Sequence, residues 1–76
     1  MKRNQKALGV AVIGLGVGEQ HARAYARDGR CVLRWLFDLS ARKAEALCRR
    51  IGAGGVAESY RQILADDGVD AVSIAS

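Results

Sequence analysis

Residues 8–18 read LGVAVIGLGVG, a short apolar run followed by glycines at positions 14, 16 and 18. The run is rich in β-branched residues, which is typical of a strand buried on both faces of a parallel sheet. A helical stretch from about Glu19 to Arg27 comes next, and Asp28-Gly29 marks its end. The stretch therefore predicts a strand, a tight glycine turn and a helix, in that order.

The rest of the chain continues this alternation of strands and helices. Ser40 and Gly52 flank a helix with one apolar face, and Ser59 and Gln62 have the spacing of a capping box. The further expected elements are strands at residues 31–37, 55–57 and 69–75 and helices at residues 41–51 and 59–65. Parallel strands need crossover connections of this kind. The sequence thus predicts an α/β fold, a truncated, doubly wound, Rossmann-like parallel sheet with strand order 3-2-1-4.

The glycine turn stands where a dinucleotide-binding motif would stand, between a strand and a helix. Gly14 permits a tight turn, and Gly16 lets the backbone approach a pyrophosphate, which the N-terminus of the following helix attracts. Asp38 lies twenty residues past Gly18, at the end of the next strand. A carboxylate there accepts hydrogen bonds from the adenosine ribose. Because it would repel a 2′-phosphate, we expect NAD rather than NADP as the cofactor.

Two features of the motif leave other interpretations open. Gly18 comes one position early for the GxGxxG pattern, and Glu19 stands where the third glycine belongs. The glycines could simply form a tight turn while Asp38 caps the next helix. A GxGxG turn with a downstream acid also suits methyltransferases that bind S-adenosylmethionine. Those enzymes usually carry an acidic residue two positions before the first glycine, where this chain has Val12.

Composition and charge exclude several classes of function. Half of the residues are hydrophobic, which argues against a disordered chain. The apolar stretches fall well short of the roughly 20 residues that a membrane-spanning helix needs, so we expect no membrane partner. The net charge of +4 comes largely from Lys2, Arg3 and Lys6, in a basic tail of residues 1–7. Without them, the chain has nine basic and eight acidic side chains and is close to neutral. Because nucleic-acid binding needs a basic patch on a folded face, we expect no nucleic-acid partner.

The two cysteines give no sign of a metal site or a disulfide. Cys31 opens an expected strand and Cys48 lies on the apolar face of an expected helix. The chain has one histidine and no CxxC pair, so no zinc site is expected. We expect both thiols to be buried and free, in a reducing cytoplasm.

Four segments, taken together, are similar to one known family. Residues 10–16 (VAVIGLG), 20–22 (QHA), 37–38 (FD) and 69–76 (VDAVSIAS) resemble the N-terminal Rossmann domain of the Gfo/Idh/MocA family, the glucose–fructose oxidoreductase and inositol dehydrogenase group. The resemblance covers nearly the whole chain. It implies that residues 8–76 are the N-terminal part of a dinucleotide-binding domain, without the substrate domain.

This resemblance implies an oxidoreductase that moves hydride between a nicotinamide cofactor and a sugar, cyclitol or similar hydroxyl-bearing substrate. The candidate cofactor-binding residues are Gly14, Leu15, Gly16, Val17, Gly18, Asp38, Arg42, Ala75 and Ser76. The family's catalytic lysine lies in a Glu-Lys-Pro segment that these 76 residues do not contain. We therefore expect no catalytic residue in this chain and no turnover by it alone. A non-catalytic NAD-sensing module is the alternative.

The predicted strand order places residues 69–75 at an edge of the sheet. An unpaired apolar edge strand is a template for pairing with another chain. We therefore expect the chain to associate with itself through this edge.

Overall fold

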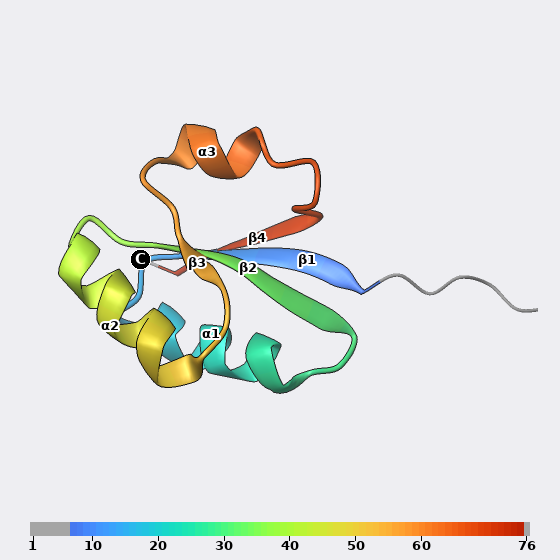
Figure 1. Ribbon diagram of the computed structural model, residues 1–76, viewed down its shortest axis with the longest axis horizontal. Coiled ribbons are helices and arrows are strands. Elements are labelled where there is room, and N and C mark those ends of the chain that lie inside the picture. Colours follow the sequence, from blue (N-terminus) through green and yellow to red (C-terminus); the bar gives the residue numbers. More distant parts are fainter. Residues whose placement is uncertain (1–6, 76) are drawn as a thin grey trace, which may run out of the picture.

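The computed structural model describes residues 7–75, which form alternating strands and helices (Figure 1). The elements are β1 (Leu8–Ile13), α1 (Gly18–Arg27), β2 (Cys31–Phe37), α2 (Ala41–Ile51), β3 (Gly55–Val56), α3 (Tyr60–Leu64) and β4 (Ala71–Ile74). Every predicted element is present, and β1 and β2 have the predicted bounds. The predicted basic tail lies outside the described residues, apart from residue 7.

The four strands form one parallel sheet in the order β3-β2-β1-β4, as the sequence predicts. Helices α1 and α2 cover one face of the sheet and α3 covers the other (Figure 1). Right-handed crossovers produce this arrangement when β2 and β3 are added on one side of β1 and β4 is then added on the other side. The doubly wound α/β fold is therefore confirmed.

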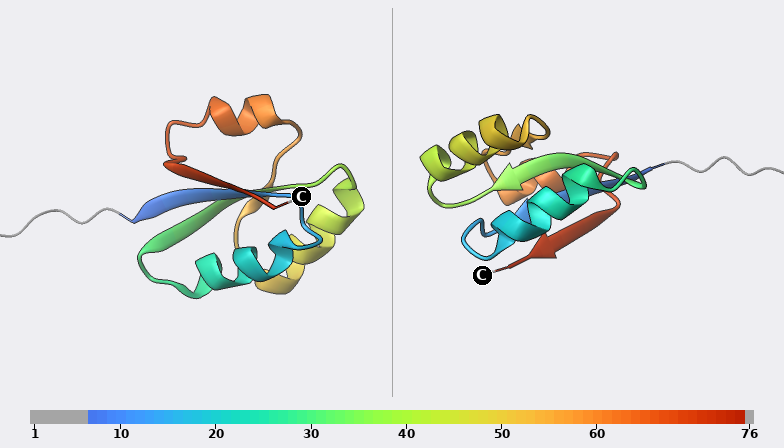
Figure 2. Two further views of the ribbon diagram at one scale, coloured as in Figure 1. Left: turned by 180° about the vertical axis from the view of Figure 1, so that it is seen from behind. Right: turned by 90° about the horizontal axis from the view of Figure 1, so that it is seen from below.

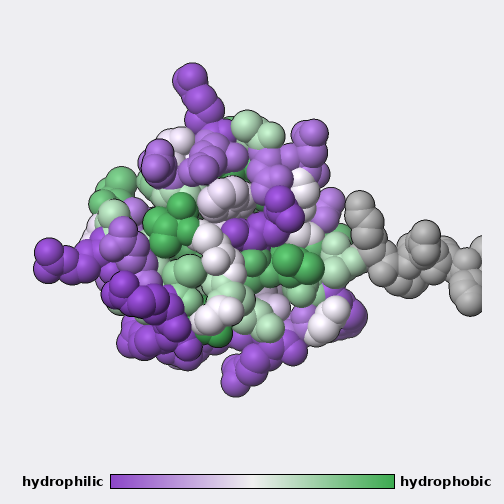
Figure 3. Space-filling view, in the orientation of Figure 1, coloured by the Kyte–Doolittle hydropathy of each residue, from purple (hydrophilic) through white to green (hydrophobic). Residues whose placement is uncertain are grey.

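Each face of the sheet has its own hydrophobic core. The larger core, beneath α1 and α2, contains Val10, Val12, Leu15, Ala22, Leu33, Leu36, Ala44 and Leu47. The smaller one, beneath α3, contains Ala11, Ile13, Ala57 and Ile63. Side chains of β1 alternate between these cores, which explains why its sequence is apolar at nearly every position. The outward surfaces of α2 and α3 are mostly hydrophilic, with hydrophobic residues visible between them (Figure 3).

A β-bulge at Arg34 changes which side chains of β2 point into each core. The register to β1 passes from Val10↔Leu33 to Ala11↔Trp35, so Arg34 is the extra residue. Leu33 and Leu36 are three positions apart, yet both are buried in the larger core. Strict alternation would place them on opposite faces. No pattern in the sequence of residues 31–37 predicts this bulge.

Predicted caps set the start of α2, the end of α2 and the start of α3. The Ser40 hydroxyl accepts a hydrogen bond from the Lys43 N–H at 3.3 Å, and Gly52 ends α2 with φ of 75°. The Ser59 hydroxyl accepts from the Gln62 N–H at 3.2 Å. The Gln62 side chain, however, accepts from the Glu58 N–H at 2.7 Å, one residue before the cap. The expected capping box is thus present in a displaced form.

The cysteines are free but only half-buried, which corrects the expectation that they are buried. Cys31 and Cys48 pack at the margin of the larger core, and the Cys48 thiol donates to the Gly54 carbonyl at 3.2 Å. Within residues 7–75, no group of side chains has the composition of a metal site. No helix in this range is long and apolar enough to cross a membrane.

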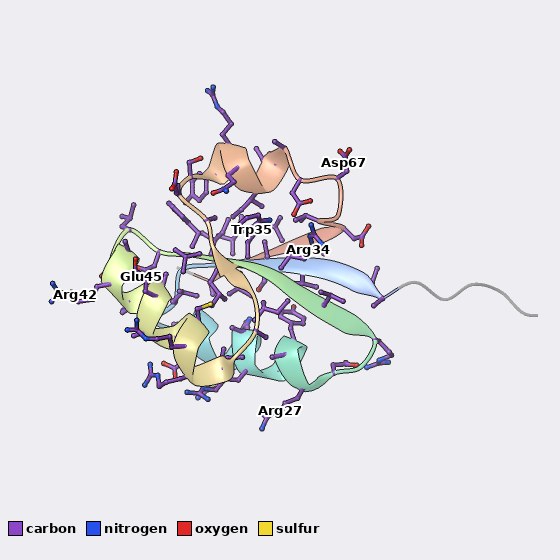
Figure 4. The ribbon with its side chains drawn as sticks, viewed as in Figure 1. Arg27, Arg34, Trp35, Arg42, Glu45 and Asp67 are labelled. Atoms are coloured by element: carbon purple, nitrogen blue, oxygen red, sulfur yellow. The ribbon has the colours of Figure 1, made fainter. Side chains whose placement is uncertain are left out.

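An ion pair connects β2 to the turn that precedes β4. Because of the bulge, Arg34 and Trp35 both lie on the α3 side of the sheet (Figure 4). The Arg34 guanidinium donates two hydrogen bonds to Asp66, at 2.7 and 2.9 Å, and the Trp35 indole N–H donates a third at 2.6 Å. The bonds from Arg34, from the Gly68 N–H and from Trp35 hold the pKa of Asp66 well below its ordinary value of 3.8.

We expect this ion pair to make stability depend on acid pH. A carboxyl whose pKa is lowered by folding stabilises the folded state above its unfolded pKa, and this stabilisation is lost as the pH falls. Urea unfolding, followed by the fluorescence of the single Trp35, should therefore shift to lower urea below about pH 4. Asp66→Asn should be less stable at pH 7 and less sensitive to acid.

Asp67→Asn is the matched control. Asp67 is an exposed neighbour that points away from the sheet (Figure 4) and accepts no side-chain hydrogen bond within residues 7–75. If the Asp67 variant lost as much acid dependence as the Asp66 variant, the ion pair would not be its source.

Candidate dinucleotide-binding site

A cleft of about 430 Å³ opens at the carboxyl ends of β1, β2 and β4. Figure 2 shows that β4 runs toward the same end of the sheet as the loop between β1 and α1. Crossovers leave the sheet in opposite directions on either side of β1, and ligands of open α/β sheets bind at such a switch point. The cleft is lined by Ile13, Gly14, Gly16, Val17, Phe37, Asp38, Leu39, Tyr60, Ile74 and Ala75.

The three glycines of the loop have three different roles. Gly14 adopts φ of 88°, which a side chain would strain, and its N–H donates to the Phe37 carbonyl at 2.9 Å. Gly16 needs no special conformation, and a Cβ there would meet only the Lys43 ammonium nitrogen, 4.0 Å away. Gly18 is buried at the start of α1, where a Cβ would lie 3.0 Å from Val12. Gly14 therefore shapes the turn, Gly18 permits close helix packing, and Gly16 leaves space at the cleft.

Asp38 is tied to the glycine loop. Its Oδ2 accepts a hydrogen bond from the Leu15 N–H at 2.8 Å, and its Oδ1 accepts from the Ser40 N–H at 2.9 Å. These bonds, the Ser40 bond first, lower the pKa of the Asp38 carboxyl below its ordinary value. The cap of α2 is the Ser40 hydroxyl, so Asp38 is not simply a helix cap. It is an anion held beside the loop, with lone pairs left for a ligand.

The N-terminus of α1 borders the cleft without a side-chain cap. Val17 occupies the cap position, and it makes no side-chain cap hydrogen bond. Glu19, in the first turn, is directed to Arg23 one turn later, with its carboxylate 3.0 Å from the guanidinium. That carboxylate is thus paired within the helix, although it still lies in the first turn.

Only some of the other predicted site residues line the cleft. Val17 and Ala75 line the cleft, whereas the Leu15 side chain is buried in the larger core and only its N–H faces Asp38. Gly18 and Arg42 are not among the lining residues, and Arg42 points away from the body of the molecule (Figure 4). Ser76 lies outside the described residues.

Besides the strand-end residues Ile13, Phe37 and Ile74, the cleft is lined by Leu39 and Tyr60, which were not predicted as site residues. Lys43, also not predicted, lies close to Gly16 but is not among the lining residues. Leu39 follows Asp38 and is 96% exposed at the rim, and Tyr60 lines the opposite wall, where its ring packs on Phe37 with centroids 5.0 Å apart. Lys43 approaches Gly16 from the first turn of α2. Exposed apolar and basic residues next to the acidic position were the available signal for Leu39 and Lys43. No local pattern marks Tyr60, which comes from a separate helix.

His21 lies next to the site but outside the cleft. Its Nδ1 is 3.3 Å from the Ser73 hydroxyl oxygen, which connects α1 to β4. This contact agrees with a packing role for the histidine.

Comparison with known proteins places the fold and the loop in one family. A family model described as "Oxidoreductase family, NAD-binding Rossmann fold" (GFO_IDH_MocA) matches residues 8–76. The comparison with curated proteins gave no match.

Several solved structures are similar over nearly the whole chain. GenD2 from gentamicin A biosynthesis, in complex with NAD, is 37% identical over 100% of this chain, with a TM-score of 0.85. A myo-inositol dehydrogenase from Lactobacillus casei, in complex with NAD(H) and myo-inositol, is 26% identical over 92%, with a TM-score of 0.84. UDP-N-acetylglucosamine 3-dehydrogenase GnnA from Acidithiobacillus ferrooxidans is 32% identical over 92%, with a TM-score of 0.78.

The match to each of these three structures spans 22% of the solved chain. The matched part contains the sheet, the glycine loop and Asp38, which are the parts that form the cleft. The chain belongs to the GFO_IDH_MocA oxidoreductase family, as an NAD-binding Rossmann fold.

Proposed function

We propose that this chain is the cofactor-binding portion of an oxidoreductase that acts on a sugar, a cyclitol or a similar hydroxyl-bearing substrate. The support for the substrate class is the kind of molecule named for its relatives, a myo-inositol dehydrogenase and a UDP-N-acetylglucosamine 3-dehydrogenase. The single observation that carries the binding function is the open space beside Gly16. A side chain at this position would fit without a clash, so packing of the protein does not explain the glycine.

The residues of the cleft fit the adenosine and pyrophosphate half of NAD. The Gly16 backbone and the uncapped start of α1 suit the pyrophosphate, and the fixed Asp38 carboxylate suits the ribose hydroxyls. Leu39 and Tyr60 supply apolar surface for the adenine. Gly14, Leu15, Val17, Gly18 and Ala75 shape or border this site, and Ser76 and Arg42 remain proposed contacts. When bound, NAD supplies the hydride acceptor.

We propose that this chain binds the cofactor and has no catalytic turnover of its own. The cleft lining contains Asp38 and the Tyr60 hydroxyl as its only ionisable groups within residues 7–75, and Asp38 is assigned to the ribose. We propose that the groups that activate the substrate hydroxyl lie in other parts of the oxidoreductase. Hydride transfer to NAD by the purified chain with a polyol would contradict this proposal.

Calorimetric titration with NAD, NADP and S-adenosylmethionine tests the binding function. We expect NAD to bind and NADP to bind at least about tenfold more weakly, because the anionic Asp38 repels a 2′-phosphate. The lowered pKa of Asp38 keeps it charged, so this preference should hold from about pH 5 to pH 8. Binding of S-adenosylmethionine in place of NAD would instead identify a methyltransferase site.

We further propose that the chain associates with itself through the outer edge of β4, which pairs with no other strand within residues 7–75. A groove of about 290 Å³ between α3 and β4 is lined by Ile13, Tyr60, Ile63, Leu64, Val72 and Ile74. Leu64 is 79% exposed and Ile74 is 71% exposed, so an apolar surface adjoins the unpaired edge. Sedimentation velocity should show dimers or larger species at high concentration, and a monomer throughout would contradict the proposal.

The proposed partners are thus the dinucleotide and a second copy of the chain, with neither nucleic acid nor membrane. The two free thiols support a reducing, cytoplasmic setting.

A further inference from the structure

Lys43 reaches the glycine loop from a different element of the fold. It lies in the first turn of α2, after the N-cap Ser40. Its ammonium nitrogen lies 4.0 Å from the position that a Cβ on Gly16 would take, and no other atom lies within 4 Å of that position apart from the loop's own chain neighbours. The space beside Gly16 is therefore bordered by one positive charge. Arg42, the preceding residue, points outward instead (Figure 4).

Two other charged side chains near the glycine loop, those of Asp38 and Glu19, are negative. The Asp38 carboxylate stands on the ribose side, and its attraction to Lys43 contributes to its lowered pKa. The Glu19 carboxylate lies in the first turn of α1, where it offsets the positive end of the helix, although it is paired with Arg23. Of the basic side chains in residues 7–75, Lys43 alone lies within 4 Å of the Gly16 Cβ position.

We propose that Lys43 binds the pyrophosphate of the dinucleotide, as a side-chain cation that supplements the backbone N–H groups of the glycine loop. This inference rests on the proposed cofactor-binding function and adds a residue to it. Gly16 is the proposed point at which the backbone approaches the pyrophosphate. The Lys43 ammonium lies 4.0 Å from the Cβ position of Gly16, so the flexible side chain can reach a ligand there although Lys43 is not among the residues that line the cleft. An ammonium is a compact charge on a flexible stem, so it can contact a phosphate oxygen without fixed geometry.

Adenosine-containing ligands with different phosphate groups separate this role from a contact to the ribose or the adenine. Wild-type protein and Lys43→Gln are titrated with NAD, ADP, NADP and adenosine in a calorimeter. We expect Lys43→Gln to bind NAD, ADP and NADP about tenfold more weakly, as for the loss of one charge-assisted hydrogen bond, and to bind adenosine unchanged. Lys43→Arg should restore most of the affinity. Raising the salt concentration should weaken NAD binding more in the wild type than in Lys43→Gln.

The variant is expected to fold, because Ser40 is bonded to the backbone N–H of Lys43 and not to its side chain. Far-UV circular dichroism checks this. Arg49→Gln is the matched control, since it removes one positive charge from the far end of the same helix. Its affinities should equal those of the wild type.

Four outcomes would overturn the inference. An equal loss of adenosine affinity would place Lys43 on the nucleoside, and a loss confined to NADP would place it on the 2′-phosphate. An equal loss in Arg49→Gln would show a general effect of net charge. Unchanged affinities in Lys43→Gln would remove Lys43 from the site while leaving the proposed function intact. If the wild type binds neither NAD nor ADP, the proposed function itself fails.

Discussion

Replacement of Gly16 by alanine should abolish most NAD binding while leaving the fold intact. Gly16 does not adopt a left-handed conformation, and apart from its chain neighbours the only atom of residues 7–75 within 4 Å of a Cβ at this position would be the Lys43 ammonium nitrogen, at 4.0 Å. Alanine should therefore be tolerated, or stabilise the protein by about 0.5 kcal/mol through the entropy of the unfolded chain. The same methyl group would stand where the pyrophosphate meets the backbone. We expect NAD affinity to fall about 100-fold, the cost of an overpacked contact.

Calorimetry with NAD and urea unfolding of the same sample measure the two effects separately. Gly29→Ala is the control, because Gly29 also has open space around its Cβ position but lies in the turn between α1 and β2, away from the cleft. It should leave both affinity and stability nearly unchanged. Loss of folding in Gly16→Ala, or full NAD affinity, would show that the space beside Gly16 is not reserved for a ligand.

Replacement of Gly9 by alanine should have the opposite pattern, a large loss of stability without a direct effect on the cleft. Gly9 lies in β1, and a Cβ there would overlap the Gly68 carbonyl oxygen and stand 2.8 Å from the Arg34 side chain. The backbone at Gly68 cannot move freely, because Gly9 and Asp70 exchange two hydrogen bonds, at 2.7 and 2.8 Å. We expect a loss of about 3 kcal/mol or more in the free energy of unfolding.

Urea unfolding monitored by Trp35 fluorescence measures this loss, with Gly29→Ala again as the control. In a chain of 76 residues, such a loss is a large share of the total stability, which is about 5–15 kcal/mol for a folded domain. A Gly9→Ala protein as stable as the Gly29→Ala protein would mean that the Gly68 carbonyl does not pack closely against Gly9 of β1.

Local sequence patterns led to a candidate site at the glycine loop and Asp38, and the structure describes the surroundings of both. The turn conformation of Gly14, the open space at Gly16 and the position of Asp38 at the end of β2 all agree with the motif. Gly18 stays a proposed pyrophosphate contact, and the structure adds that a Cβ on it would lie 3.0 Å from Val12, so its missing side chain also permits close packing of α1. Its early position in the motif does not alter that packing role, which the third glycine of such a loop normally has.

Lys43 and Tyr60 were missed because they come near the glycine loop only in three dimensions. Lys43 projects from α2 toward a residue 27 positions earlier in the chain, and Tyr60 comes from the opposite side of the sheet. The motif contains no information about such approaches, which depend on how the carboxyl ends of parallel strands converge.

Sequence alone determined the order of elements, their helix caps and the parallel sheet in the order 3-2-1-4. These features depend on apolar periodicity, glycine and serine at helix ends, and the handedness of crossovers, all of which are local or general. Only the tertiary structure decided that Arg34 forms a bulge, that Asp66 closes an ion pair with it, and that Lys43 faces Gly16. The physical reason is that the bulge, the ion pair and the position of Lys43 all depend on which side chains share a face once the strands have paired. Packing across the sheet decides this, and no local pattern contains it.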